Sequence, residues 1–185
     1  MPTAVAILVI HLWWEGAYDH LQAPDFWVKV PGHGIDDLER GTVAVAPPVF
    51  NVTLRVDNGV TRLPFCTGRA SAVVAYAGVQ LAHADLPTGF CVPGRVVSSV
   101  PIVATSDGLG IPDELYERME SQRRRHERVS LEVQVKLEDC DGCGPFPAML
   151  WCIAVLHGQP QEGPFRCPFF YMVKGGQRSP CIGCF

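Results

Sequence analysis

The chain has 185 residues, of which 48% are hydrophobic and 18% charged. This length suits one domain with flanking pieces, and the apolar content is enough for a full core, which excludes a largely disordered protein. The net charge of −4 excludes a general nucleic-acid binder, because such proteins carry a strongly basic surface.

Residues 1–14 form an apolar segment. Positions 2–14 contain no Asp, Glu, Lys or Arg and end in Trp13 and Trp14, a pair typical of a membrane interface. The run is shorter than the roughly 20 residues that span a bilayer, and it lacks the basic start of a secretory signal. We interpret it as the outer part of a truncated signal-anchor helix, with the following acidic flank on the non-cytoplasmic side. A buried strand or helix of the domain is the alternative.

Residues 15–48 are rich in Pro and Gly, which predicts a spacer with short entering strands at 26–30 and 42–46. Residues 49–185 are expected to form the main domain. Residues 50–58 and 129–138 carry apolar side chains at every second position, the pattern of a half-buried strand.

Turn signals divide the rest of this domain. We expect a turn at Asn58-Gly59, a loop at 62–68 and a tight turn at Ala77-Gly78. Further strands are predicted at 70–76, 79–84, 96–105, 148–156 and 169–173, and we expect an antiparallel meander. The strand count favours an all-β fold, an antiparallel β-sandwich with one short surface helix.

That helix is predicted at 112–128. Pro112 suits a first helical turn, acidic residues follow it, and Arg123, Arg124, Arg125 and Arg128 crowd its end, which matches both ends of the helix dipole. The arginines could bind an anionic partner. A solvated helix end is the preferred interpretation, because the chain is acidic and the helix offers one aromatic side chain.

The segments "PDFWVKV", "FNVTLRVDN", "AVVAYAGVQLAHADLP" and "RVSLEVQVKLE" together resemble the plant late-embryogenesis-abundant group 2 domain. The resemblance covers about residues 24–185 and is greatest to the membrane-anchored NDR/HIN-like (hydroxyproline-rich glycoprotein-like) branch. The matching positions are Tyr76, Gly78 and Leu81 in a hairpin, Leu86 and Pro87 in a Leu-Pro step, and Cys167 in a late strand.

The resemblance implies a fibronectin-III-like β-sandwich in a single-pass membrane protein of plant stress or pathogen responses, with no catalytic motif to carry over. It also implies the plasma membrane, with the domain on the non-cytoplasmic side. The chain departs from the family pattern because it lacks a cytoplasmic tail and a full-length membrane span.

Eight cysteines occur, an even number that suits a disulfide framework in a domain facing outward. The sequence does not fix their pairing among Cys66, Cys91, Cys140, Cys143, Cys152, Cys167, Cys181 and Cys184. The less favoured alternative is a zinc site, because two Cys-x-x-Cys hairpins can present four thiolates. Its ligands would be Cys140, Cys143, Cys181 and Cys184.

Asn51-Val52-Thr53 is an N-glycosylation sequon. The alternation that points Val52 inward turns Asn51 outward, so Asn51 is a candidate for glycosylation if the domain faces the lumen.

Common catalytic motifs are missing from the sequence, including the nucleophile elbow, the phosphate-binding loop, the zinc-protease helix and the dinucleotide fingerprint. We therefore expect no enzyme and no cofactor. The leading hypothesis is a membrane-tethered interaction domain that acts through unidentified proteins in plant defence or stress and binds no nucleic acid. The alternatives are a soluble intracellular stress-protective domain of the same fold and a zinc-binding module.

Overall fold

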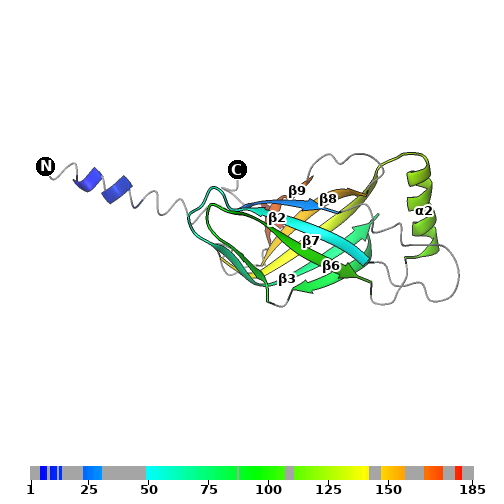
Figure 1. Ribbon diagram of the computed structural model, residues 1–185, viewed down its shortest axis with the longest axis horizontal. Coiled ribbons are helices and arrows are strands. Elements are labelled where there is room, and N and C mark those ends of the chain that lie inside the picture. The colour runs from blue at the N-terminus through cyan, green and yellow to red at the C-terminus, as the bar shows by residue number, and fades with distance from the viewer. Residues whose placement is uncertain are drawn as a thin grey trace.

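A computed structural model gives the arrangement of the chain (Figure 1). It describes residues 5–7, 9–11, 13, 23–30, 49–86, 88–106, 111–141, 147–156, 165–172 and 178–180. The strands are β1 (Asp25–Lys29), β2 (Val49–Asp57), β3 (Phe65–Tyr76), β4 (Val79–Leu86), β5 (Phe90–Val92), β6 (Val97–Thr105), β7 (Val129–Cys140), β8 (Ala148–Leu156), β9 (Phe165–Arg166), β10 (Phe169–Met172) and β11 (Arg178–Pro180). One short helix, α2 (Asp113–Arg124), accompanies them in this domain.

The strands form a sheet in the order β11-β10-β8-β7-β3-β4-β6-β2-β1-β9, with β5 paired to β3. Each neighbouring pair among the described strands is antiparallel. The all-β fold with one short helix is therefore confirmed.

The sheet is weakest between β4 and β6, which separates its strands into two sets. Strands β4 and β6 meet at the single bridge His83↔Thr105, whereas β2 and β6 pair from Val49↔Thr105 to Asp57↔Val97. The chain from 165 to 172 links the two sets, because β9 pairs with β1 and β10 pairs with β8. Figure 1 shows β2 and β6 crossing in front of β7 and β8. The β-sandwich and its finer fibronectin-III-like arrangement stay predictions.

Alternating side chains build the core between the two sets. Phe50, Val52, Leu54 and Val56 of β2 are buried, and so is every second residue of β7 from Val129 to Leu137. These residues belong to one hydrophobic cluster, so the two-faced strands read from the sequence are confirmed.

The turn between β3 and β4 is also confirmed. Ala77 and Gly78 both have positive φ, at 49° and 80°, as a two-residue hairpin turn requires. The expected loop at 62–68 is wrong over its second half, because β3 already begins at Phe65. Phe65 and Thr67 are buried there, and this part of β3 pairs with β5.

The expected meander is wrong. Strand β2 does not pair with β3, its successor in the chain, since β6 and β1 flank β2 while β7 and β4 flank β3. Asn58-Gly59 consequently does not form a hairpin turn. The chain leaves β2 there and crosses to the other set of strands.

Helix α2 covers one end of the sheet, at the right of Figure 1. Met119 is buried, Leu115 packs against the core, and the Tyr76 hydroxyl donates a hydrogen bond to Gln122 Oε1 at 2.8 Å. The helix ends at Arg124, four residues before the predicted end, because His126 adopts the left-handed backbone with φ 57°. The short strand expected at 42–46 lies outside the described residues.

Candidate functional site

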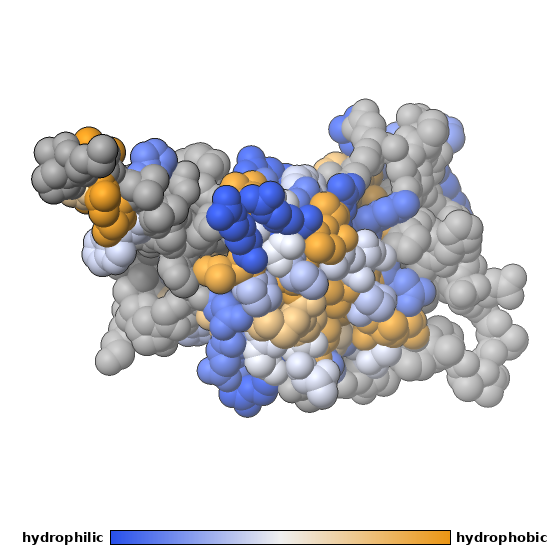
Figure 2. All heavy atoms as spheres, turned by 60° about the vertical axis from the view of Figure 1, so that its left-hand side comes forward, coloured by the Kyte–Doolittle hydropathy of each residue, from blue (hydrophilic) through white to orange (hydrophobic). Residues whose placement is uncertain are grey.

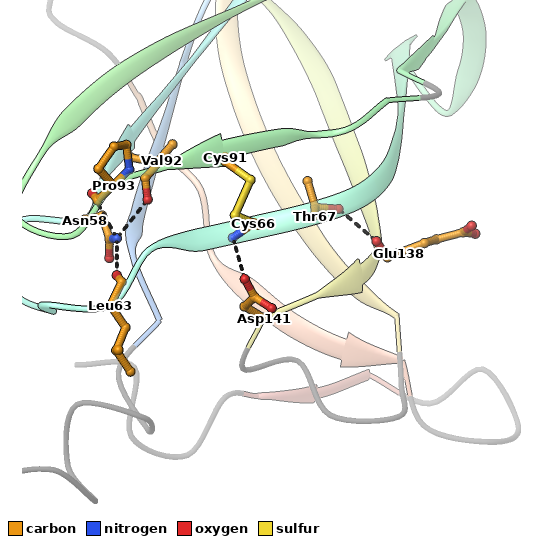
Figure 3. Close-up of a disulfide and its surroundings, with 9 residues drawn as sticks. All are labelled: Asn58, Leu63, Cys66, Thr67, Cys91, Val92, Pro93, Glu138 and Asp141. Atoms are coloured by element: carbon orange, nitrogen blue, oxygen red, sulfur yellow. Dashed lines mark hydrogen bonds between the residues drawn. A yellow bond between two sulfur atoms is a disulfide. The ribbon is translucent and has the colours of Figure 1, made fainter.

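The first disulfide ties the short strand β5 to β3. Cys66 and Cys91 are register partners in this antiparallel pair, with Cα atoms 4.1 Å apart (Figure 3). The backbone N–H of Cys66 donates to Asp141 Oδ2 at 3.2 Å, which brings the chain after β7 to the same place. The disulfide and this hydrogen bond together hold β3, β5 and the chain after β7 at one end of the sheet.

The second disulfide lies in the core. Cys152 of β8 is bonded to Cys167, and both are buried. The N–H of Cys167 also donates to the carbonyl of Phe26 in β1 at 2.8 Å. Cys167 thus lies between β9, which pairs with β1, and β10, which pairs with β8, and the disulfide holds this connection to β8.

Cys140 is disulfide-bonded as well, at the end of β7. Cys143, Cys181 and Cys184, the other three expected zinc ligands, lie outside the described residues. Within the part of the chain that the structure describes, no three His, Cys, Asp or Glu side chains are grouped closely enough to hold a metal ion. A disulfide-bonded Cys140 has no thiolate to offer, and the zinc site stays a prediction.

Asn58 joins the loop after β2 to the loop before β6. Its side chain is 1% exposed, and Nδ2 donates to the carbonyls of Leu63, Val92 and Pro93 at 2.8–3.2 Å (Figure 3). Oδ1 accepts a bond of 2.6 Å from the Thr61 hydroxyl. Buried polar groups in native proteins are hydrogen-bonded, and both the donor and the acceptor of this amide have partners.

The backbone strengthens the same junction. Asn58 N–H donates to Val96 O, and Arg95 N–H donates to the carbonyls of Asn58 and Thr61. Arg95 has φ 60°, an uncommon conformation for a side-chain-bearing residue, and these bonds hold it there. Gly94 allows the close approach, because a Cβ at this position would lie 2.2 Å from Arg62 O. We call residues 58–64 and 93–96 the paired loops.

Several charged side chains of the sheet are matched with partners. Lys136 donates a hydrogen bond to Glu138, which together with the nearby positive charges of Lys136 and Arg69 lowers the pKa of that carboxyl below its ordinary value. Asp25 accepts from Arg166 at 2.7 Å, and Asp57 Oδ1 accepts from Gly59 N–H at 2.8 Å.

Asn51 is exposed on β2, opposite the exposed Val103 of β6. The outward orientation expected from the alternation is confirmed, and nothing in the described strand obstructs access to the amide. Glycosylation at Asn51 stays a prediction.

The arginine-rich end of α2 borders a shallow surface hollow of about 390 Å³. Its lining carries two Glu and two Arg, and Arg124 Nε lies 3.1 Å from Glu120 Oε1. The charges of the lining therefore balance, as the solvated-helix interpretation expects.

The N-terminal segment is helical at residues 5–7, 9–11 and 13. Its apolar side chains are exposed, Trp13 at 81% and Ile7 at 66%, and Figure 1 shows these residues standing clear of the sheet. None of the helices in the described stretches has the length and apolar character needed to cross a membrane.

Comparisons with known proteins add little. No protein-family model matches the chain, and no curated protein matches it. A crystal structure of a protein from Archaeoglobus fulgidus is similar over 83% of this chain and 91% of that chain, with 12% sequence identity and a TM-score of 0.36. A similarity this weak supports no conclusion about fold or function.

Local patterns indicated most of these features, but none indicated the role of Asn58. An Asn-Gly pair after an alternating strand normally indicates a turn, and only the pairing of distant strands shows that this Asn is buried. The pairing of the cysteines could not be derived from the sequence, because eight cysteines allow 105 pairings.

Proposed function

We propose that the chain is a non-enzymatic interaction domain tethered to a membrane, with its β domain on the non-cytoplasmic side. In this proposal it acts through contacts with other proteins in plant stress or defence responses, at the plasma membrane. The observation that carries the placement is the pair of disulfides, Cys66–Cys91 and Cys152–Cys167.

Disulfides persist in oxidising compartments and are rare in the reducing cytosol. Two of them in one domain, one of them buried in the core, favour a domain that folds in the secretory route. They weigh against the alternative of a soluble intracellular protein.

The exposed N-terminal helix supports the tether. Val5, Ile7, Val9, Ile10 and Trp13 are each more than half exposed. Water-exposed apolar side chains in such a group favour transfer to a lipid or protein environment. The defence or stress role rests on the resemblance to the NDR/HIN-like branch alone.

Membrane extraction and protease protection test this proposal together. We would express the chain with a C-terminal tag in plant cells, extract the membranes with alkaline carbonate, and treat intact cells with protease. The proposal predicts that the protein stays in the membrane pellet and that external protease removes the tag.

The double variant Ile7→Asp/Ile10→Asp should release the protein from the pellet, because two charges in the apolar segment oppose membrane insertion. Val103→Asp is the matched control, since Val103 is 56% exposed on the sheet and should not affect extraction. A wild-type protein that is soluble in carbonate, or a tag protected in intact cells, would contradict the proposal.

A further inference from the structure

The paired loops and Val97, the first residue of β6, carry exposed apolar side chains. Val60 is 67% exposed, Val97 46%, and Leu63 and Val96 40% each. We call these four residues the loop patch. Figure 2, in which this side of the molecule comes forward, shows apolar and hydrophilic side chains mixed on it.

The loop patch is held rigidly. The hydrogen bonds of Asn58 to both loops and the backbone bonds of Arg95 fix Val60 and Val96 relative to one another. A preorganised apolar surface loses little conformational entropy on binding, whereas a flexible surface would lose much more.

Two basic side chains flank the patch. Arg62 and Arg95 are exposed and lie in the paired loops, as Val60, Leu63 and Val96 do. At the same end of the sheet, Asp57 accepts a hydrogen bond from Gly59 N–H and Asp25 pairs with Arg166. Apolar side chains beside arginines suit the boundary of a bilayer, where acyl chains and phosphate groups meet.

The chain enters the domain at this same end. Asp25, the first residue of β1, is the register partner of Asp57, the last residue of β2, which runs into the paired loops. The N-terminal helix lies beyond this end of the sheet in Figure 1. Ten residues separate Trp14 from Asp25, and even fully extended they span only about 35 Å.

We propose that the loop patch docks on the phospholipid bilayer that holds the N-terminal segment. Val60, Leu63, Val96 and Val97 enter the boundary between headgroups and acyl chains, and Arg62 and Arg95 contact lipid phosphates. The β domain then stands with its paired loops against the membrane and α2 facing away. This orientation rests on the proposed tether.

Lipid photocrosslinking tests the docking. The full chain is reconstituted in phosphatidylcholine vesicles that contain a phospholipid with a photoreactive group at the acyl boundary, and the labelled peptides are identified by mass spectrometry. We expect lipid adducts on two regions: the N-terminal segment 4–14 and the paired loops.

The double variant Val60→Asp/Val97→Asp should lower the loop adducts by about tenfold or more while the adducts on 4–14 remain, because buried carboxylates lose their hydration. The matched control is Val103→Asp/Ile153→Asp, whose positions are 56% and 54% exposed away from the paired loops. It should leave both regions unchanged.

The outcomes separate the two proposals. Adducts on 4–14 without adducts on the loops would overturn the docking and leave the tether intact. Adducts on the loops alone would support docking and contradict the tether. Adducts on neither region would overturn both, and equal loss in the control variant would show that the loop adducts are not specific.

Discussion

At the scale of single residues, the side-chain amide of Asn58 connects positions that are up to 35 residues apart in the sequence. Asn58→Ala removes the donor for three carbonyls and the acceptor for Thr61. Because buried groups that lose their partners cost about 1–3 kcal/mol, we expect the free energy of unfolding to fall by about 2–3 kcal/mol. Urea denaturation would measure this change.

Asn51→Ala is the matched control in unglycosylated protein, since this asparagine is exposed. It should change stability by less than about 0.5 kcal/mol. Equal effects of the two substitutions would show that Asn58 does not hold the loops together.

Val133 tests the inward face of β7 in the same way, because its side chain is fully buried. Val133→Asp places a carboxyl in the core, where it must either take up a proton or remain as a charge without a partner. Either state should lower the free energy of unfolding by about 4 kcal/mol or more. Val103→Asp, on an exposed position, should leave the melting temperature nearly unchanged. An unaltered melting curve for Val133→Asp would refute the burial of this face.

Among the elements, helix α2 allows the stability contributions of one exposed and one buried side chain to be compared. Arg124 is 71% exposed beside Glu120, so Arg124→Ala should cost no more than about 1 kcal/mol. Met119 is buried against the core, so Met119→Ala should cost about 2–4 kcal/mol. Thermal unfolding of both variants checks the pair, and a larger loss at Arg124 than at Met119 would mean that the helix packs through its other face.

Each disulfide also stabilises the connection between two segments of the sheet. They close sequence separations of 25 and 15 residues, for which loop entropy predicts similar contributions of about 3 kcal/mol each. Cys152→Ala/Cys167→Ala should cost more than Cys66→Ala/Cys91→Ala, because it also leaves a cavity in the core. Chemical denaturation without reductant compares the two, and the reverse order would contradict the burial of Cys152 and Cys167.

Elements were predictable where one local pattern decides them. The alternation in β2 and β7, the Ala77-Gly78 turn and the start of α2 after Pro112 each depend on neighbours in the sequence. The start of β3 at Phe65 was not predictable, because Pro64 and Gly68 suggest a loop. The pairing with β5, which makes this segment a strand, joins residues that are distant in the sequence.

At the scale of the whole molecule, the pairing of strands could not be derived from the sequence. The alternation in β2 says which face is buried, but not that β6 rather than β3 lies beside it. The partner of Cys167 depends on the same long-range order, since Cys152 of β8 comes close to Cys167 only where β10 pairs with β8. The paired loops follow from that order as well.

The proposed placement requires an oxidised domain outside the cytosol. The most direct measurement is to alkylate thiols in intact cells that make the protein, digest it without reduction, and map the linked peptides by mass spectrometry. We expect peptides joined through Cys66–Cys91 and Cys152–Cys167. Alkylated free thiols at these four positions would contradict it.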